Sequence, residues 1–238
     1  MAWVAGVDGC SFGWLAVLHE TAKGEWNSYS KKTFAEILTL SENPEFIAVD
    51  IPIGLAGEAI PGGRACDHLT RRILGQHRGR SVFSSPVRAA LAHINDYPAA
   101  SRANRESSTH GIGLSKQAFA IMPKIRDVDD SMSPEVQNRV FEVHPELCFY
   151  ELNGCNPIVH GKKSSAGALE RRGLLEKIGF KAFLRGKVEE AGSKFRLDDL
   201  LDASVACWTA RRIMEKVAIP LPESSSRDMK LLRMQIWR

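Results

Sequence analysis

The sequence predicts an α/β protein in which a mixed sheet is flanked by helices. Short apolar runs at residues 3–7, 14–18 and 46–49 have the length of buried strands, and a long helical segment at residues 197–218 follows them. The chain has 238 residues, of which 44% are hydrophobic, which suffices for one substantial core. We therefore expect a single domain over residues 1–238, with a long, mostly helical or loop insertion at about residues 51–138.

The first two strands are predicted to form a β-hairpin. Residues 3–7 are small and apolar and end at Asp8, and Gly9 and Gly13 bracket a tight turn before the apolar run at residues 14–18. An aspartate that closes a strand of small apolar residues has little structural purpose, so Asp8 is the leading candidate for a functional residue.

The other elements follow from periodicity and from the positions of Gly and Pro. They are a helix at residues 33–40, a strand at 46–49 that ends at Asp50, a short helical pattern at 67–74 within a segment rich in Gly, Pro and Arg, mostly helix over 87–130 with a break at Tyr97-Pro98, a strand at 140–143, and helix over 166–184.

Composition excludes several classes of protein. Five cysteines, an odd number with no CxxC pair, argue against a disulfide framework or a structural zinc site. The first residues lack the basic stretch of a signal peptide, and no apolar run approaches the roughly 20 residues of a membrane-spanning helix. We expect a cytoplasmic protein with no membrane partner, and the net charge of +4 neither requires nor excludes a polyanion.

Acidic residues recur at the ends of the predicted strands and on the long helix. Mg2+ and Mn2+ prefer hard oxygen ligands, and two-metal phosphoryl chemistry needs three or four carboxylates from separate elements. The predicted metal ligands, which are also the predicted catalytic acids, are Asp8, Asp50, Glu142, Asp199 and Asp202.

Structural explanations compete with these assignments. Asp198 is expected only to begin its helix, and the same explanation is open for Asp199, whereas Asp202 lies one turn further in among apolar residues and needs a partner. Strand alternation leaves open that Glu142 faces water. His144 is a candidate general base, with a hydrogen-bonded structural histidine as the alternative.

Arginines concentrate in residues 64–88, where six of them accompany a single acid, Asp67, for a local charge of +5. Arginine binds phosphate through two parallel hydrogen bonds, so this segment is predicted to contact a nucleic-acid or nucleotide phosphate. A solvated helix face with a few salt bridges is the alternative. The predicted phosphate contacts are Arg64, Arg71, Arg80, Arg88 and Lys124.

Seven motifs along nearly the whole chain resemble an uncharacterised family described as predicted ribonuclease H-like nucleases of a domain of unknown function. They are, in order, GVDGCSFGW, DIPIGL, RACD, SVFSSPVR, LSKQAFAIMPKI, FEVHPELCF and DDLLDA. The resemblance implies a ribonuclease H-like mixed sheet, in which acids of the first strand, the fourth strand and the last helix bind two metal ions. Asp8, Asp50 and the pair Asp199 and Asp202 match these positions, and Glu142 would lie on the following strand.

The resemblance favours a metal-dependent nuclease that hydrolyses phosphodiester bonds. The alternatives are a non-catalytic module that binds nucleic acid or protein and, third, an ATP-binding phosphotransferase-like protein, for which 238 residues leave little room because such proteins build two similar domains. Neither GxxxxGK[ST] nor GxGxxG after a strand is present. The helical acid pair is similar to that of junction resolvases, which makes a homodimer an expectation to test, and the long insertion leaves substrate preference open.

Overall fold

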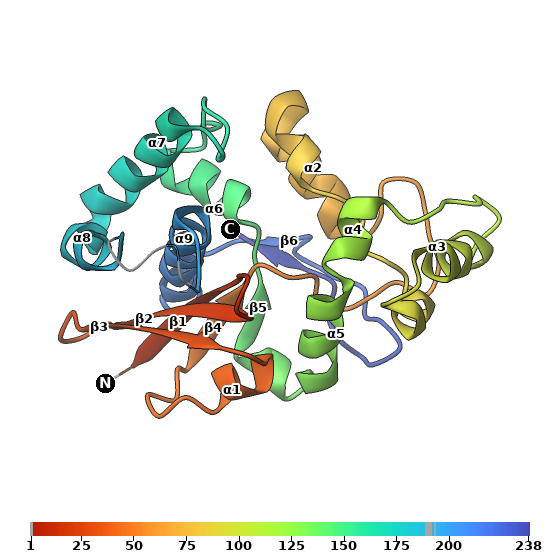
Figure 1. Cartoon of the computed structure of the whole chain (residues 1–238), viewed down its shortest axis with the longest axis horizontal. Helices are drawn as coiled ribbons and strands as arrows, with labels where there is room; N and C mark the ends of the chain where they lie inside the picture. Colours follow the sequence, from red (N-terminus) through yellow and green to blue (C-terminus); the bar gives the residue numbers. More distant parts are fainter. Residues whose placement is uncertain (1, 189–191, 193) are drawn as a thin grey trace. The chain divides into compact units, whose positions relative to one another are not determined.

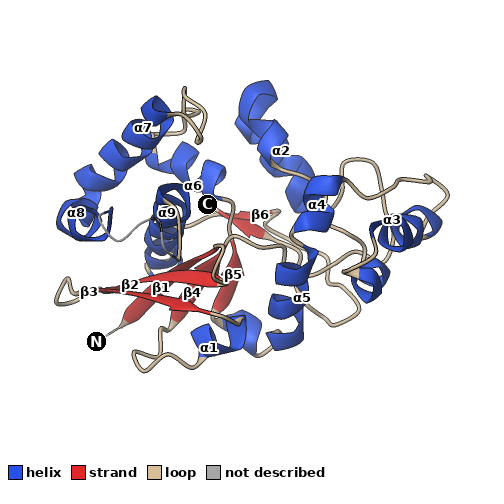
Figure 2. Cartoon of the chain, in the orientation of Figure 1, coloured by secondary structure: helices blue, strands red, loops and turns tan. Residues whose placement is uncertain are grey.

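The computed structural model describes residues 2–188, 192 and 194–238, and these form two compact units. The first, here called the sheet unit, lies within residues 1–50, 139–219 and 237–238. The second, the helical unit, lies within residues 51–138 and 220–236, so it combines the expected insertion with a segment near the end of the chain. Figure 2 separates the strands from the helices by colour.

The sheet unit contains a five-stranded mixed sheet in the order β3-β2-β1-β4-β5. The antiparallel pairs are β1 with β2 and β2 with β3, and the parallel pairs are β1 with β4 and β4 with β5. This confirms the expected α/β class and hairpin. The bounds are β1 Trp3–Gly9, β2 Trp14–Glu20, β3 Trp26–Lys31, β4 Phe46–Val49 and β5 Val140–Glu142.

The edge strand β3 was not expected from the sequence. Its residues, WNSYSK, include only two apolar side chains, and all six positions are partly exposed. A strand at the edge of a sheet does not have to bury one face fully, so its sequence lacks the apolar alternation that identifies inner strands.

Helices flank this sheet, as expected. They are α1 Phe34–Leu38, α6 Pro145–Leu152, α7 Ser165–Leu175, α8 Lys181–Val188 and α9 Leu197–Met214. The helix expected over 166–184 is interrupted by a wider turn at Glu176–Phe180, where Gly179 has a φ of +104°. Figure 1 shows α1 and α9 on opposite sides of the sheet.

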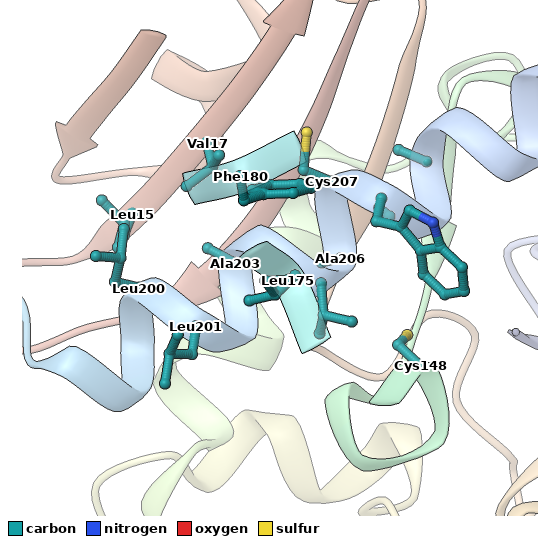
Figure 3. Close-up of a cluster of buried hydrophobic side chains, with 14 of the residues drawn as sticks. Leu15, Val17, Cys148, Leu175, Phe180, Leu200, Leu201, Ala203, Ala206 and Cys207 are labelled. Carbon is teal, nitrogen blue, oxygen red and sulfur yellow. The ribbon is translucent and has the colours of Figure 1, made fainter. Parts of the chain in front are cut away.

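The helix α9 lies directly against β1 because of Gly6. A Cβ atom at residue 6 would meet the backbone of α9, at 2.0 Å from the Cys207 nitrogen and 2.1 Å from the Ala203 oxygen. Small residues of α9 therefore sit on the strand, and larger side chains such as Leu15 and Phe180 complete the core around them (Figure 3). This contact fixes the position of the acidic first turns of α9 over the sheet.

The helical unit consists mainly of four helices and short 3-10 turns. The helices are α2 Ala65–Arg78, α3 Tyr97–Glu106, α4 Lys116–Ala120 and α5 Met122–Ser131. The strand β6 Pro220–Leu221 also belongs to this unit, and β7 Ile236–Trp237 begins in it and ends in the sheet unit. The expected break at Tyr97-Pro98 is the start of α3, where Pro98 occupies the first turn after the cap Asp96. Within the described ranges, no helix is long and apolar enough to span a membrane.

Candidate functional site

Three carboxylates of the sheet unit gather at one edge of its sheet, and we call Asp8, Asp50 and Asp202 the carboxylate cluster. The strands β1 and β4 are parallel neighbours, so their carboxyl ends lie side by side, and the Asp50 amide donates to the Val7 carbonyl at 3.0 Å. Asp8 follows Gly6 by two residues and so faces α9, which contributes Asp202. Asp8 and Asp202 are only 8% and 3% exposed.

The pKa values of the three acids are raised by burial and by repulsion from neighbouring acids. Burial, followed by repulsion from Asp50 and Asp202, raises the pKa of Asp8 well above its usual value. Burial is also the main reason that the pKa of Asp50 and the pKa of Asp202 each rise to about 6. The fold therefore holds these carboxyl groups where ionisation is unfavourable, an arrangement that is more common at functional sites than in purely structural ones.

One ammonium group partly offsets this charge. Lys162 lies in the loop before α7, and its Nζ donates to an Asp202 carboxylate oxygen at 2.9 Å, with 43% of the lysine side chain exposed. Attraction to Asp202, then to Asp50 and Asp8, raises the pKa of Lys162. Nothing in the local sequence around Lys162 indicates that it reaches an acid 40 residues further along the chain.

Asp198 and Asp199, the two acids in the first turn of α9, have different contacts. An Asp199 carboxylate oxygen accepts the Arg196 amide at 2.8 Å, which caps the helix, and burial raises the pKa of Asp199. Asp199 also contributes repulsion to Asp8, so it combines a capping function with a place beside the cluster. Asp198 accepts a bond from Arg196 at 3.2 Å, in keeping with the expectation that it begins the helix.

A buried ion pair that the sequence did not reveal borders the cluster. Glu146, in the first turn of α6, accepts a bond from the Arg171 guanidinium at 2.6 Å, with the two side chains 8% and 2% exposed. The second Glu146 carboxylate oxygen, Oε2, is buried and has no hydrogen-bond partner among the described residues. Glu146 also raises the pKa of Asp50 and of Asp202, which places its charge near both.

The structure does not bring Glu142 to the carboxylate cluster. In the sheet register Glu142 pairs with Val49, and Val49 pairs with Val7, so all three share the face opposite to that of Asp8. Glu142 is buried there, at 5% exposure, and does not face water. His144 is the residue before α6, and its carbonyl accepts the first amide bonds of that helix.

The predicted phosphate contacts all lie in the helical unit, and two have strong partners within it. Arg64 is 3% exposed and binds the Asp67 carboxylate at 2.7 Å as well as two backbone carbonyls. Arg88 pairs with Asp129 at 2.8 Å and with Asp228. These two guanidinium groups hold the unit together. Lys124 lies in α5, and Arg71 and Arg80 line a cavity.

No group of three or more His, Cys, Asp or Glu side chains in the described part of the chain has the spacing of a formed metal site. The carboxylate cluster is a concentration of negative charge beside the Lys162 ammonium.

Comparisons with known proteins give one match. No curated protein matches the chain, and no solved structure does. A family model matches residues 6–227, which span the sheet unit's acids and the whole of residues 51–138. The chain therefore belongs to the family described as a protein of unknown function (DUF429).

Proposed function

We propose that the sheet unit is a divalent-metal-dependent phosphodiester hydrolase, a nuclease of the ribonuclease H-like type, whose metal ligands are Asp8, Asp50 and Asp202. The observation that carries the proposal is the charge of the cluster. Three carboxylates from separate elements, two of them buried, lie near one ammonium, that of Lys162, which is bonded to Asp202 and attracted by the charges of Asp50 and Asp8. Buried charge without compensation is unfavourable, and a cation supplies the compensation.

The donor chemistry fits magnesium or manganese. The cluster offers carboxylate oxygens, which are the ligands that hard divalent ions prefer, and the charge of Asp199 also acts on Asp8. The acids lie at the end of β1, after β4 and on the last helix, the positions that the family resemblance implies. When bound, such ions supply an activated water and neutralise charge on the leaving oxygen.

The chain's own residues have distinct parts in this proposal. The parallel ends of β1 and β4 hold Asp8 and Asp50 side by side, and the close contact of α9 with Gly6 fixes Asp202 opposite them. Lys162 is half-exposed at the same place, where its ammonium can bind a non-bridging phosphate oxygen of the substrate. Glu142 has no part in this set, because it faces away from it.

A metal titration with parallel cleavage assays tests the proposal. Mg2+ and Mn2+ binding is measured by calorimetry, and cleavage is measured on labelled single-stranded, duplex and branched DNA and RNA. We expect Asp202→Asn and Asp8→Asn to abolish metal binding and to lower turnover by about a thousandfold or more. Asp198→Asn is the matched control on the same helix and keeps both.

Two results would contradict the nuclease proposal. The first is a folded wild-type protein that binds neither ion at millimolar concentration. The second is cleavage that survives both substitutions. The remaining candidate would then be a binding module in which Lys162 is the permanent partner of Asp202, an arrangement that their 2.9 Å bond favours.

A further inference from the structure

A cavity of about 280 Å³ lies within the helical unit, and neither the proposed hydrolase nor the carboxylate cluster accounts for it. Its lining comes from three stretches, residues 56–64, 80–87 and 104–117, together with Arg71 of α2. Pockets for drug-sized ligands have volumes of roughly 300–1,000 Å³, so this one suits a small metabolite.

The lining carries an excess of positive charge. Arg64, Arg71 and Arg80 contribute to it, against one acidic side chain, that of Glu58. The charge of Arg64 is neutralised by Asp67. Within the described ranges, neither Arg71 nor Arg80 forms an ion pair, so two cationic groups face the cavity with no carboxylate bound to them.

Arg71 also fixes the shape of the cavity. Its guanidinium donates to the carbonyls of Gly62 and Val82, at 2.5 and 2.7 Å, and to the Ser84 hydroxyl oxygen at 3.1 Å. A guanidinium has five N–H groups, so these three bonds leave two for a ligand. The arginine thereby joins two walls of the cavity and keeps part of its hydrogen-bonding capacity.

Hydrogen bonds also hold the third lining stretch, residues 104–117, in place. The Asn104 side chain accepts the Val87 amide and donates to the Ile112 carbonyl, both at 2.9 Å. Gly63 lies so close to Ser84 that a Cβ atom there would be 2.9 Å from the serine hydroxyl oxygen. Bonds within the protein therefore shape the cavity, and a preformed site binds at a lower entropic cost than one that must be ordered.

We propose that this cavity binds a small phosphate monoester. The terminal oxygens of a phosphate match the donors of Arg71 and Arg80 and the hydroxyls of Ser84 and Ser85. The organic part of the ligand lies against Phe83 and the other apolar lining residues. Every residue that lines the cavity belongs to the helical unit, whereas the proposed metal ligands belong to the sheet unit.

Calorimetric titration of the full chain in the presence of EDTA tests this, because EDTA removes any contribution from a metal site. The probes are inorganic phosphate, glycerol 3-phosphate and the carboxylate analogue glycerate. We expect glycerol 3-phosphate to bind most tightly, and Arg80→Gln, a change at an exposed side chain, to weaken it about tenfold or more. The matched control is Arg72→Gln, because Arg72 is an exposed arginine of α2 outside the cavity lining.

Several outcomes would overturn the proposal. They are no heat of binding from folded wild-type protein at millimolar glycerol 3-phosphate, equal weakening by Arg72→Gln and Arg80→Gln, and glycerate binding as tight as that of the phosphate ester. An oligonucleotide without a terminal phosphate that binds more tightly, and depends on Arg80, would assign the arginines to a polynucleotide instead. Failure of metal binding at the carboxylate cluster would leave the result unaffected.

Discussion

Replacing Asp50 by asparagine should stabilise the metal-free protein at neutral and alkaline pH. The pKa of Asp50 is raised from 3.8 to about 6, mainly by burial. The folded state therefore holds the proton more tightly than the unfolded state, and stability is lost as the pH rises through the interval between these two values. Asparagine has nearly the shape of the protonated acid and no charge to lose.

The shift sets the size of the effect. A rise of about two pKa units corresponds to about 3 kcal/mol in the free energy of unfolding, at about 1.4 kcal/mol per unit. We expect Asp50→Asn to be about 2–3 kcal/mol more stable than wild type near pH 8 and nearly equal to it near pH 4. A functional site that lowers the stability of the ligand-free protein is expected to give such a gain when its charge is removed.

Tryptophan fluorescence in urea is the suitable assay. All five tryptophans, at positions 3, 14, 26, 208 and 237, belong to the sheet unit, so their emission reports on the unit that contains the cluster. Glu45→Gln, at an exposed acid of the same unit, is the control and should change stability by less than about 0.5 kcal/mol at either pH. If Asp50→Asn is no more stable than wild type near pH 8, Asp50 is a satisfied structural acid and the reasoning about the cluster is wrong.

Three further substitutions test the surroundings of the site. Lys162→Gln should lower the stability of the metal-free protein by about 1 kcal/mol, since the lysine is half-exposed, and added Mg2+ should restore it; a denaturation curve unchanged in either condition would contradict this. Arg171→Met should cost about 3–5 kcal/mol in urea denaturation by leaving Glu146 buried and unpaired, and the double variant with Glu146→Leu should recover most of the loss. Gly6→Ala should prevent folding or lower the free energy of unfolding by more than about 4 kcal/mol, because its Cβ would enter the backbone of α9. Gly186→Ala, with open space around it, should not destabilise the protein. Equal circular-dichroism melting curves for the two variants would refute the contact.

Sequence periodicity was sufficient to predict the inner strands and the long helix. The runs that became β1, β2 and β4 are apolar at nearly every position, so local composition alone identifies strands buried on both faces. The same pattern predicted that Asp8 and Asp50 end their strands. The parallel pairing of β1 with β4, which the structure shows, then places these two carboxylates at the same edge of the sheet.

The partners of those acids could not be predicted from the sequence, because the local spacing of residues does not indicate which distant segments form ion pairs. Lys162 is 40 residues from Asp202, and Arg171 is 25 residues from Glu146. The cluster of arginines predicted a phosphate surface, yet Arg88 meets Asp228, an acid 140 residues away. Only the packed structure shows which charges are compensated.

The sequence by itself determined that this chain is an α/β protein whose strands end in aspartates, because strand periodicity and chain direction are local properties. The tertiary structure decided which acids share a face. The register of β5 turns Glu142 away from Asp8, and the contact of α9 with Gly6 brings Asp202 toward it. Register and helix packing depend on contacts between residues far apart in the chain, so the composition of the carboxylate cluster was fixed only when the chain folded.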